Sequence, residues 1–160
     1  LEVNEQQTFS NEEHLRIVMS TRDLEESYFA RRTQDYTDAI GAIEESQDIL
    51  ATIFSGAGSF VEISKVTKKM LQHAINIKAT AQYAPVLSAL AQLAVKERQV
   101  DESALERVAQ LLETLKKNIK TAFDDFGTSN ADAVEAFNEQ KERLDGQLAR
   151  LATQEEKLID

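Results

Sequence analysis

Apolar side chains in residues 105–126 recur at alternating spacings of three and four, and this pattern constrains the fold more than any other feature. Charged side chains such as Glu106, Glu113 and Lys117 occupy positions between them. The spacing predicts an α-helix with one apolar side, built to pack lengthwise against other helices. The members of this first seam are Leu105, Val108, Leu112, Leu115, Ile119, Ala122 and Phe126.

A second seam follows in residues 134–158, and a third series lies near the amino-terminal end. Lys141 and Glu155 interrupt the second seam, and interruptions of this kind usually specify register or partner. The second seam consists of Val134, Phe137, Leu144, Leu148, Leu151 and Leu158. The third series has heptad spacing and consists of Leu15, Arg22, Phe29, Tyr36, Ile43 and Leu50. We expect the first two seams to form the core or the assembly contacts.

The composition favours helix over sheet. The 160 residues include one Pro, five Gly and no Trp or Cys, and 42% are hydrophobic, which is enough to bury a core. Straight-chain residues such as Leu, Glu, Gln and Lys lose little rotamer freedom in a helix. The sequence therefore predicts an all-α fold, an extended antiparallel helical bundle with coiled-coil-like hairpins of about four to five helices.

Capping and turn residues divide the predicted single domain, residues 1–160, into segments. Pro85 suits a first helical turn, and Gly127 suits the end of a helix. If Gly127 does not break the chain, one very long helix results. The predicted segments are an extension at 1–9, a long helix at 10–54, a Gly-rich turn at 55–59, two shorter helices around Pro85 in 60–98, and helices at 101–126 and 130–158.

Charge and residue types exclude several functions. A net charge of −10, from 28 acidic and 18 basic residues, repels nucleic acid. No apolar run is long enough to insert into a membrane. His14 and His73 have no partners in a known ligand pattern, and a chain without Cys has no thiolate nucleophile. We therefore expect no enzyme and no firm cofactor.

Calcium is the one ion that the acidic surface suggests, because Ca²⁺ prefers oxygen ligands. The acidic groups lack EF-hand spacing, so they are only weak candidates for calcium binding. Replacing Glu44 and Glu45 with Gln is expected to leave the fold nearly intact and to alter the calcium response. The candidate calcium ligands are Glu44, Glu45, Asp48, Asp124 and Asp125.

Three ordered blocks of the sequence resemble the trichocyst matrix proteins, the ciliate family that fills regulated dense-core secretory granules. Each block is an amphipathic helical pattern, and together they span roughly residues 15–150. The blocks are residues 29–50, Tyr83 with residues 87–94, and residues 108–119 followed by Asp124-Asp125 and residues 137–148.

The resemblance implies a structural protein of the granule lumen that is released extracellularly. Members of the family are cut from secreted precursors, assemble with homologous polypeptides into a crystalline lattice, and expand with calcium during exocytosis. No catalytic residue is implied. A start at Leu1 without a signal peptide fits a mature product of such processing.

Two other classes remain open from the residues alone. The same seams could belong to a helical-bundle adaptor or tether that grips one partner at a defined stoichiometry. An enzyme would need carboxylates such as Glu44, Glu45 and Asp48 to meet others across the bundle, as in di-iron proteins. The absence of a Glu-x-x-His motif argues against this enzyme.

Overall fold

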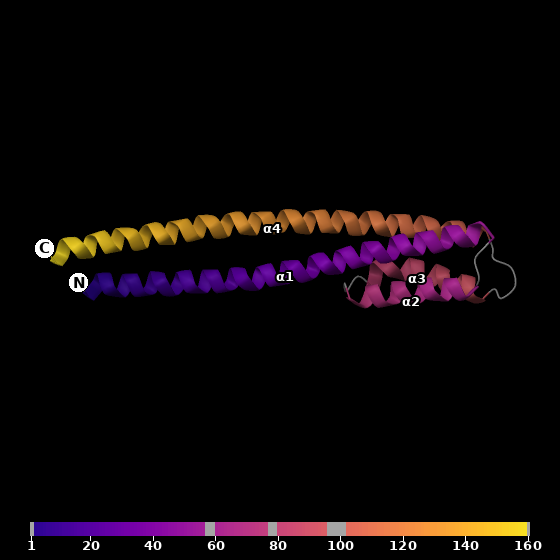
Figure 1. The fold of residues 1–160 in the computed structure, drawn as a ribbon, viewed down its shortest axis with the longest axis horizontal. Helices are drawn as coiled ribbons and strands as arrows, with labels where there is room; N and C mark the ends of the chain where they lie inside the picture. Colours follow the sequence, from indigo (N-terminus) through magenta and orange to yellow (C-terminus); the bar gives the residue numbers. More distant parts are fainter. Residues whose placement is uncertain (1, 57–59, 77–79, 96–101, 160) are drawn as a thin grey trace. The chain divides into compact units, whose positions relative to one another are not determined.

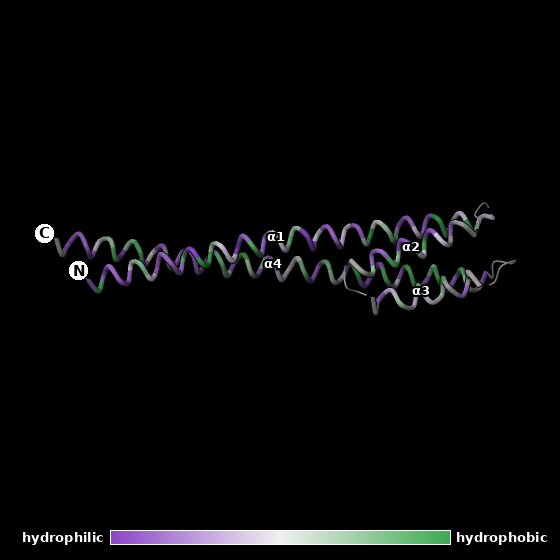
Figure 2. The backbone as a smooth tube through the Cα atoms, turned by 90° about the horizontal axis from the view of Figure 1, so that it is seen from below, coloured by the Kyte–Doolittle hydropathy of each residue, from purple (hydrophilic) through white to green (hydrophobic). Residues whose placement is uncertain are grey.

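The computed structural model describes residues 2–56, 60–76, 80–95 and 102–159, and its regular secondary structure there is entirely α-helical. The helices are α1 (Glu2–Phe54), α2 (Phe60–Asn76), α3 (Thr80–Val95) and α4 (Glu102–Ile159) (Figure 1). Hydrophobic and hydrophilic residues alternate along the two long helices, as expected for helices with one apolar side (Figure 2). The prediction of an all-α fold is confirmed.

The chain divides into two compact units. Unit 1 comprises Leu1–Ala30 and Phe126–Asp160, and unit 2 comprises Arg31–Asp125. Helices α1 and α4 each contribute one part to unit 1 and another part to unit 2, whereas α2 and α3 belong to unit 2 alone. The two units therefore differ in how many helices build their cores.

Unit 2 is held by a core to which all four helices contribute, and α2 packs against α3. Complete burial of one such aliphatic or aromatic side chain contributes about 1.5–3 kcal/mol. The continuous apolar cluster thus supplies the main stabilisation of unit 2. Its largest fully buried members include Ile43 and Leu50 of α1, Val66 and Met70 of α2, Tyr83, Val86 and Leu90 of α3, and Val108, Leu112 and Ile119 of α4.

In unit 1, α1 and α4 run side by side in opposite directions. The side chain of His14 lies 3.2 Å from Gln140, whereas the rings of Phe29 and Phe126 stack at 5.0 Å. The residue number of the contact on α4 thus decreases as the residue number of the contact on α1 increases, so the two helices are antiparallel in this unit. Both chain ends, marked N and C in Figure 1, lie at the same end of this unit.

Helix α1 begins at Glu2, so residues 2–9 are helical rather than the expected extension. The first turn carries Glu2 and Glu5, and negative side chains stabilise the amino-terminal end of a helix. No Gly or Pro interrupts the segment before Ser10, the expected start. Ser10-Asn11-Glu12-Glu13 has the sequence of a capping box, which is a local signal for a helix start, and a helix already formed upstream needs no cap there.

Helix α4 continues through Gly127 in place of the corner expected at 127–130. A Gly in a helix costs about 1 kcal/mol relative to Ala, but packing on both sides of this position outweighs the cost. Phe126 stacks on Phe29 of α1, and Asn130 accepts a hydrogen bond from Arg22. Asn130, which belongs to the expected corner, therefore takes part in the contact with α1.

Gly56 ends α1 with a backbone conformation that other residues rarely adopt. Its φ is 76°, its N–H donates to the carbonyl of Ile53 at 3.0 Å, and the N–H of Ser55 donates to Ala51 at 3.1 Å. This is the left-handed helix end that Gly favours. It agrees with the predicted Gly-rich turn at 55–59, of which residues 57–59 lie outside the described ranges.

Replacing Gly127 with Ala is expected to raise the free energy of unfolding by about 0.5–1 kcal/mol. An added Cβ has open space there, and the unfolded chain loses conformational freedom. Gly56→Ala is the matched control and is expected to destabilise, since its φ of +76° strains an L side chain. Urea unfolding of both variants measures the difference, and a destabilised Gly127→Ala variant would contradict a continuous helix.

Pro85 lies inside α3 rather than at its first position, because α3 begins at Thr80. Its missing N–H removes one helical hydrogen bond in the second turn, and its exposed ring leaves the carbonyl of residue 81 open to the surface. The two shorter helices predicted in 60–98 correspond to α2 and α3, and α3 begins five residues before Pro85. Residues 77–79 and 96–98 lie outside the described ranges.

Candidate assembly seams and charged surface

The first predicted seam is buried within unit 2. Each of the five members that α4 places there is at most 3% exposed, because α1, α2 and α3 supply the remaining members of the core cluster. These five residues are Leu105, Val108, Leu112, Leu115 and Ile119. This part of the seam is thus closed within a single chain and is not available to another molecule.

The second seam is only partly covered. Leu144 and Leu151 are buried, whereas the other described members are half-buried, and the side chain of Leu158 lies outside the described part. Unit 1 has only two helices, so an apolar stripe on either one is covered from one direction. The half-buried members are Val134, Phe137 and Leu148, and Phe126, the last residue of the first seam, is half-buried as well.

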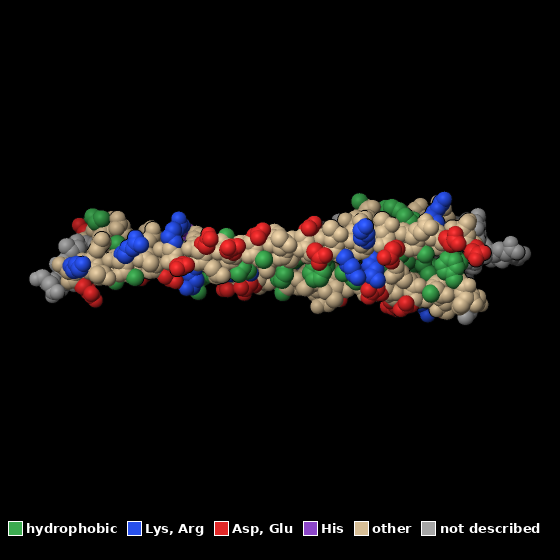
Figure 3. Space-filling model, turned by 90° about the horizontal axis from the view of Figure 1, so that it is seen from above, with side chains coloured by type: hydrophobic (Ala, Val, Ile, Leu, Met, Phe, Trp, Pro, Cys, Tyr) green, Lys and Arg blue, Asp and Glu red, His purple; other side chains and the backbone are tan. Residues whose placement is uncertain are grey.

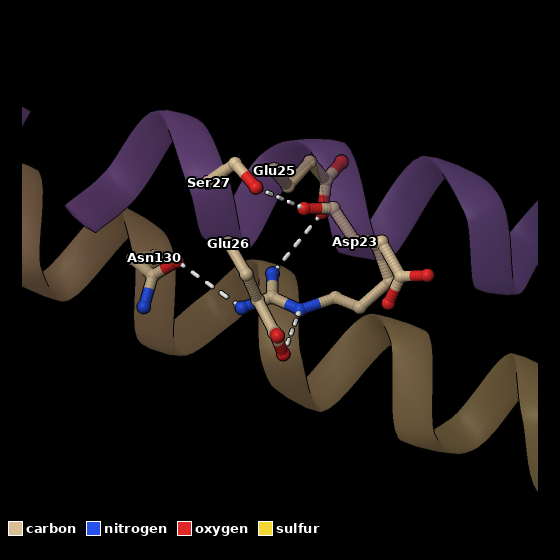
Figure 4. A network of polar contacts seen from close by, with 6 residues as sticks. Asp23, Glu25, Glu26, Ser27 and Asn130 are labelled. Carbon is tan, nitrogen blue, oxygen red and sulfur yellow. Dashed lines mark hydrogen bonds and ion pairs between the residues drawn. The ribbon is translucent and has the colours of Figure 1, made fainter. Parts of the chain in front are cut away.

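Arg22 occupies a seam position of α1 and is only 6% exposed. Its guanidinium donates to Glu25 at 3.1 Å, to Glu26 at 3.3 Å and to the side-chain oxygen of Asn130 at 3.4 Å (Figure 4). A buried cation is tolerated when carboxylates and hydrogen-bond acceptors surround it. The contact with Asn130 joins α1 to α4 and favours one register of the two helices.

Aromatic rings fill the seam on either side of the boundary between the units. In unit 1 the edge of Tyr28 meets Phe126 at 6.1 Å. In unit 2 Tyr36 stacks on Phe123 at 5.3 Å, and the guanidinium of Arg32 lies 5.5 Å from the Tyr36 ring centre. The spacing of apolar residues predicted Phe126 and Tyr36 as seam residues but not Phe123, which lies one position after the seam residue Ala122.

Two of the candidate calcium ligands, Glu44 and Glu45, form ion pairs with lysine side chains. Lys116 donates to Glu44 at 2.9 Å, and Lys69 pairs with Glu45. The hydrogen bond with Lys116 lowers the pKa of Glu44, and the same bond raises the pKa of Lys116. The charge of Asp48 also raises the pKa of Lys116, so this lysine lies near both acids. A calcium ion at these carboxylates would have to displace Lys116 or Lys69.

The other two candidates, Asp124 and Asp125, are exposed neighbours on α4. Consecutive residues of a helix point about 100° apart, so these carboxylates do not converge on one ion. Within the described ranges no three His, Cys, Asp or Glu side chains are grouped as a metal site requires. The candidates from the two acidic stretches are therefore not brought together.

The negative charge is concentrated in unit 1. Its sequence contains 15 acidic and 6 basic residues, for a net charge of −9, whereas unit 2 contains 13 acidic and 12 basic residues, for −1. Acidic and basic side chains lie interspersed in the view of Figure 3, with hydrophobic side chains exposed among them. Unit 2 is thus nearly neutral, and repulsion between copies arises mainly from unit 1.

A groove of about 420 Å³ lies between α1 and α4 of unit 1. Ile17 and Thr21 of α1 and Ala133, Ala136 and Phe137 of α4 contribute to its lining. The two small alanine side chains leave space beside Ile17, which is 50% exposed.

No described helix has the length and apolar character needed to cross a membrane. No curated protein and no solved structure matches the chain. The family model of Trichocyst matrix protein T1-F matches residues 1–159, which confirms the resemblance noted in the sequence. Because this match covers almost the whole chain, the protein belongs to the trichocyst matrix protein T1-F family.

Proposed function

We propose that the protein assembles with related chains into a crystalline, calcium-responsive secretory-granule matrix, which expands on exocytosis. The family match over residues 1–159 carries this proposal, since membership gives a structural role in the trichocyst matrix. The family is one of matrix proteins rather than of enzymes. In this proposal the chain is processed from a precursor, resides in the granule lumen and is released extracellularly.

The two units suggest separate tasks in such an assembly. Unit 2 has a closed four-helix core and a net charge of −1, so it forms a stable, nearly neutral body. Unit 1 has a partly open two-helix seam and a net charge of −9. Apolar contacts through its open side would hold neighbours together, while like charges push them apart.

In this proposal calcium acts on the summed carboxylate charge of unit 1 rather than at one chelating site. Divalent cations change the repulsion between acidic surfaces by binding weakly and by screening. The lysine partners of Glu44 and Glu45 in unit 2 support this interpretation, because a nearby ammonium competes with a cation. Charge balance and apolar contact together would set the spacing of the matrix.

Static light scattering of the full chain, alone and mixed with related matrix polypeptides, tests this proposal. We expect the size of the assembly to change when calcium reaches millimolar concentration, and to change less with NaCl of equal ionic strength. A chain that stays monomeric and unchanged under every calcium and pH condition, including in the mixtures, would contradict the proposal.

A charge-reducing variant locates the calcium response. In this variant four glutamates of unit 1 are replaced with Gln, which changes the net charge of the unit from −9 to −5. The four residues are Glu12, Glu135, Glu139 and Glu142. We expect this variant to shift the calcium midpoint, since less repulsion remains to be neutralised. The matched variant Glu44→Gln with Glu45→Gln keeps the fold nearly intact. An unchanged response in this matched variant would remove these two carboxylates from consideration, and a lost response would place calcium in unit 2.

A further inference from the structure

One side of α4 carries acidic residues followed by basic residues, all at heptad spacing. Residues seven apart in a helix lie on nearly the same side, since two turns hold about 7.2 residues. The side chains of this set are all exposed, and they fall within a sector of about 40° on the helix. We call the set the α4 charge stripe. Its members are Asp125, Asp132 and Glu139, followed by Arg143, Arg150 and Lys157.

The basic residues of the stripe differ from the other basic residues of unit 1 in having no partner within the chain. In the described part of the chain no ion pair reaches Arg143, Arg150 or Lys157. Basic side chains recur along unit 1 near the chain ends in Figure 3. The other basic residues are neutralised by carboxylates one turn away on their own helix. These ion pairs join Arg16 to Glu13, Arg22 to Glu25 and Glu26, and Lys141 to Asp145.

The order of the charges makes the stripe complementary to itself when two copies of α4 run antiparallel. A two-fold axis at the level of residue 141 places residues equally far before and after that level opposite each other. Every charged residue of the stripe then faces a residue of opposite charge on the second copy. The facing pairs are Glu139 with Arg143, Asp132 with Arg150, and Asp125 with Lys157.

The uncharged positions on this side of α4 fit the same axis. Ala136 faces Gly146, and side chains this small let two helices approach closely. Toward the edges of the stripe Thr128 faces Gln154. Glu135, at the other edge, faces Gln147. The two-fold axis therefore brings no two like charges opposite each other on this side.

The net charge of −9 on unit 1 does not lie at this contact. The stripe has three acidic and three basic residues and is neutral, whereas seven of the 15 acidic residues of unit 1 belong to α1. Repulsion between more distant carboxylates is screened beyond about 10 Å at 0.1 M salt, and opposite charges in contact attract. A uniformly acidic or uniformly basic partner would meet like charges along half of the stripe, so the charge order favours a second copy.

From these observations we propose that the α4 charge stripe binds the α4 charge stripe of a second copy of this chain, antiparallel and about a two-fold axis. The inference rests on the proposed assembly and deepens it by naming one contact between copies. A single exposed ion pair stabilises little, so the six pairs about the axis act together. Their main effect is to fix the orientation and the register of the two copies.

Charge exchange tests the docking by sedimentation velocity of the full chain, at one NaCl concentration throughout. Arg143→Glu with Arg150→Glu makes this part of the stripe acidic, and Asp132→Lys with Glu139→Lys makes it basic. Like charges then face each other across the axis, so we expect the dissociation constant of the dimer to rise about tenfold or more in both variants. All four substitutions together exchange the signs and are expected to restore the dimer.

Net charge separates this contact from general repulsion. The acidic variant changes the net charge from −10 to −14, the basic variant changes it to −6, and the fourfold variant keeps it at −10. Glu12→Lys with Glu156→Lys is the matched control, since it also gives −6 but at exposed positions off the stripe. We expect this control to dimerise at least as tightly as the wild type.

Two results of these measurements overturn the inference. One is a basic stripe variant that dimerises as tightly as the control of equal charge. The other is a fourfold variant that stays monomeric although its circular dichroism spectrum is as helical as that of the wild type. A wild-type chain that stays monomeric here but assembles with related chains in calcium overturns this docking and leaves the proposed function standing.

Disulfide formation tests the register, because the chain contains no Cys. A mixture of Ala136→Cys and Gly146→Cys chains is expected to give a linked dimer on mild oxidation, and an added Cβ at Gly146 has open space within the chain. Either variant alone is expected to link poorly, since its two Cys residues lie about 15 Å apart along the helices. Equal linkage in the mixture and in the single variants overturns the register.

Discussion

Replacing Leu112 with Ala lowers the free energy of unfolding by about 2–5 kcal/mol. Leu112 is fully buried among residues of all four helices of unit 2, so the smaller side chain leaves a cavity that the surrounding helices fill only in part. Because the first seam is closed within one chain, the loss occurs in the monomer and does not depend on protein concentration. Urea unfolding followed by circular dichroism measures it.

Leu71→Ala is the matched control for this change. Leu71 belongs to α2 of the same unit, but 49% of it is exposed, so its truncation is expected to cost less than about 1 kcal/mol. Equal losses in the two variants would mean that Leu112 is not in the core. A loss at Leu112 that grows on dilution would mean that the seam closes between chains instead.

Replacing Tyr83 with Phe is expected to stabilise the protein, against the usual direction of core substitutions. Tyr83 is fully buried in unit 2, and its hydroxyl has no hydrogen-bond partner in the part of the chain that the structure describes. A buried polar group without a partner costs about 1–3 kcal/mol. Phe keeps the ring and removes the hydroxyl, so we expect a gain of about 1 kcal/mol at neutral pH.

The same residue predicts a loss of stability at high pH. Burial raises the pKa of Tyr83 from 10.0 to about 12, because the phenolate is disfavoured in the core. Below pH 10 the hydroxyl is neutral in both the folded and the unfolded chain, so the full stability is present. As the pH rises from 10 to about 12, the unfolded chain releases this proton first, and stability falls by on the order of 2–3 kcal/mol.

Urea unfolding of the wild type and of Tyr83→Phe across this pH range isolates the effect, since Lys and Arg titrate alike in both proteins. Tyr28→Phe is the control, because Tyr28 is 56% exposed. We expect the difference between wild type and Tyr83→Phe to widen above pH 10 and the Tyr28→Phe curve to follow the wild type. Parallel curves for all three proteins would place the Tyr83 hydroxyl in contact with water.

The seam residues show how much of the core could be predicted from the spacing of apolar residues alone. Leu112, Ile119, Ile43 and Leu50 are all at most 1% exposed, at positions that the periods of three, four and seven had placed on one side of a helix. The period is a local property, so it could be read without knowing what covers the helix. It also placed Arg22 at a seam position, where it is buried although it is charged.

The helix ends were harder to predict. Ser10 and Gly127 carry cap signals, yet α1 begins earlier and α4 continues. A cap contributes about 1 kcal/mol, and contacts with another helix can outweigh it. At Gly127 those contacts come from Phe29 and Arg22, about a hundred residues away in the sequence. Such distant contacts decide whether a marginal break occurs.

The sequence by itself determined the helical class, the apolar side of each long helix and the acidic character, because these follow from local period and composition. Only the tertiary structure decided which part of a seam is closed. Covering a stripe depends on which distant helices lie against it, and α2 and α3 reach the part in unit 2 alone. The partly covered second seam in unit 1, where most of the negative charge also lies, is therefore a consequence of packing rather than of pattern.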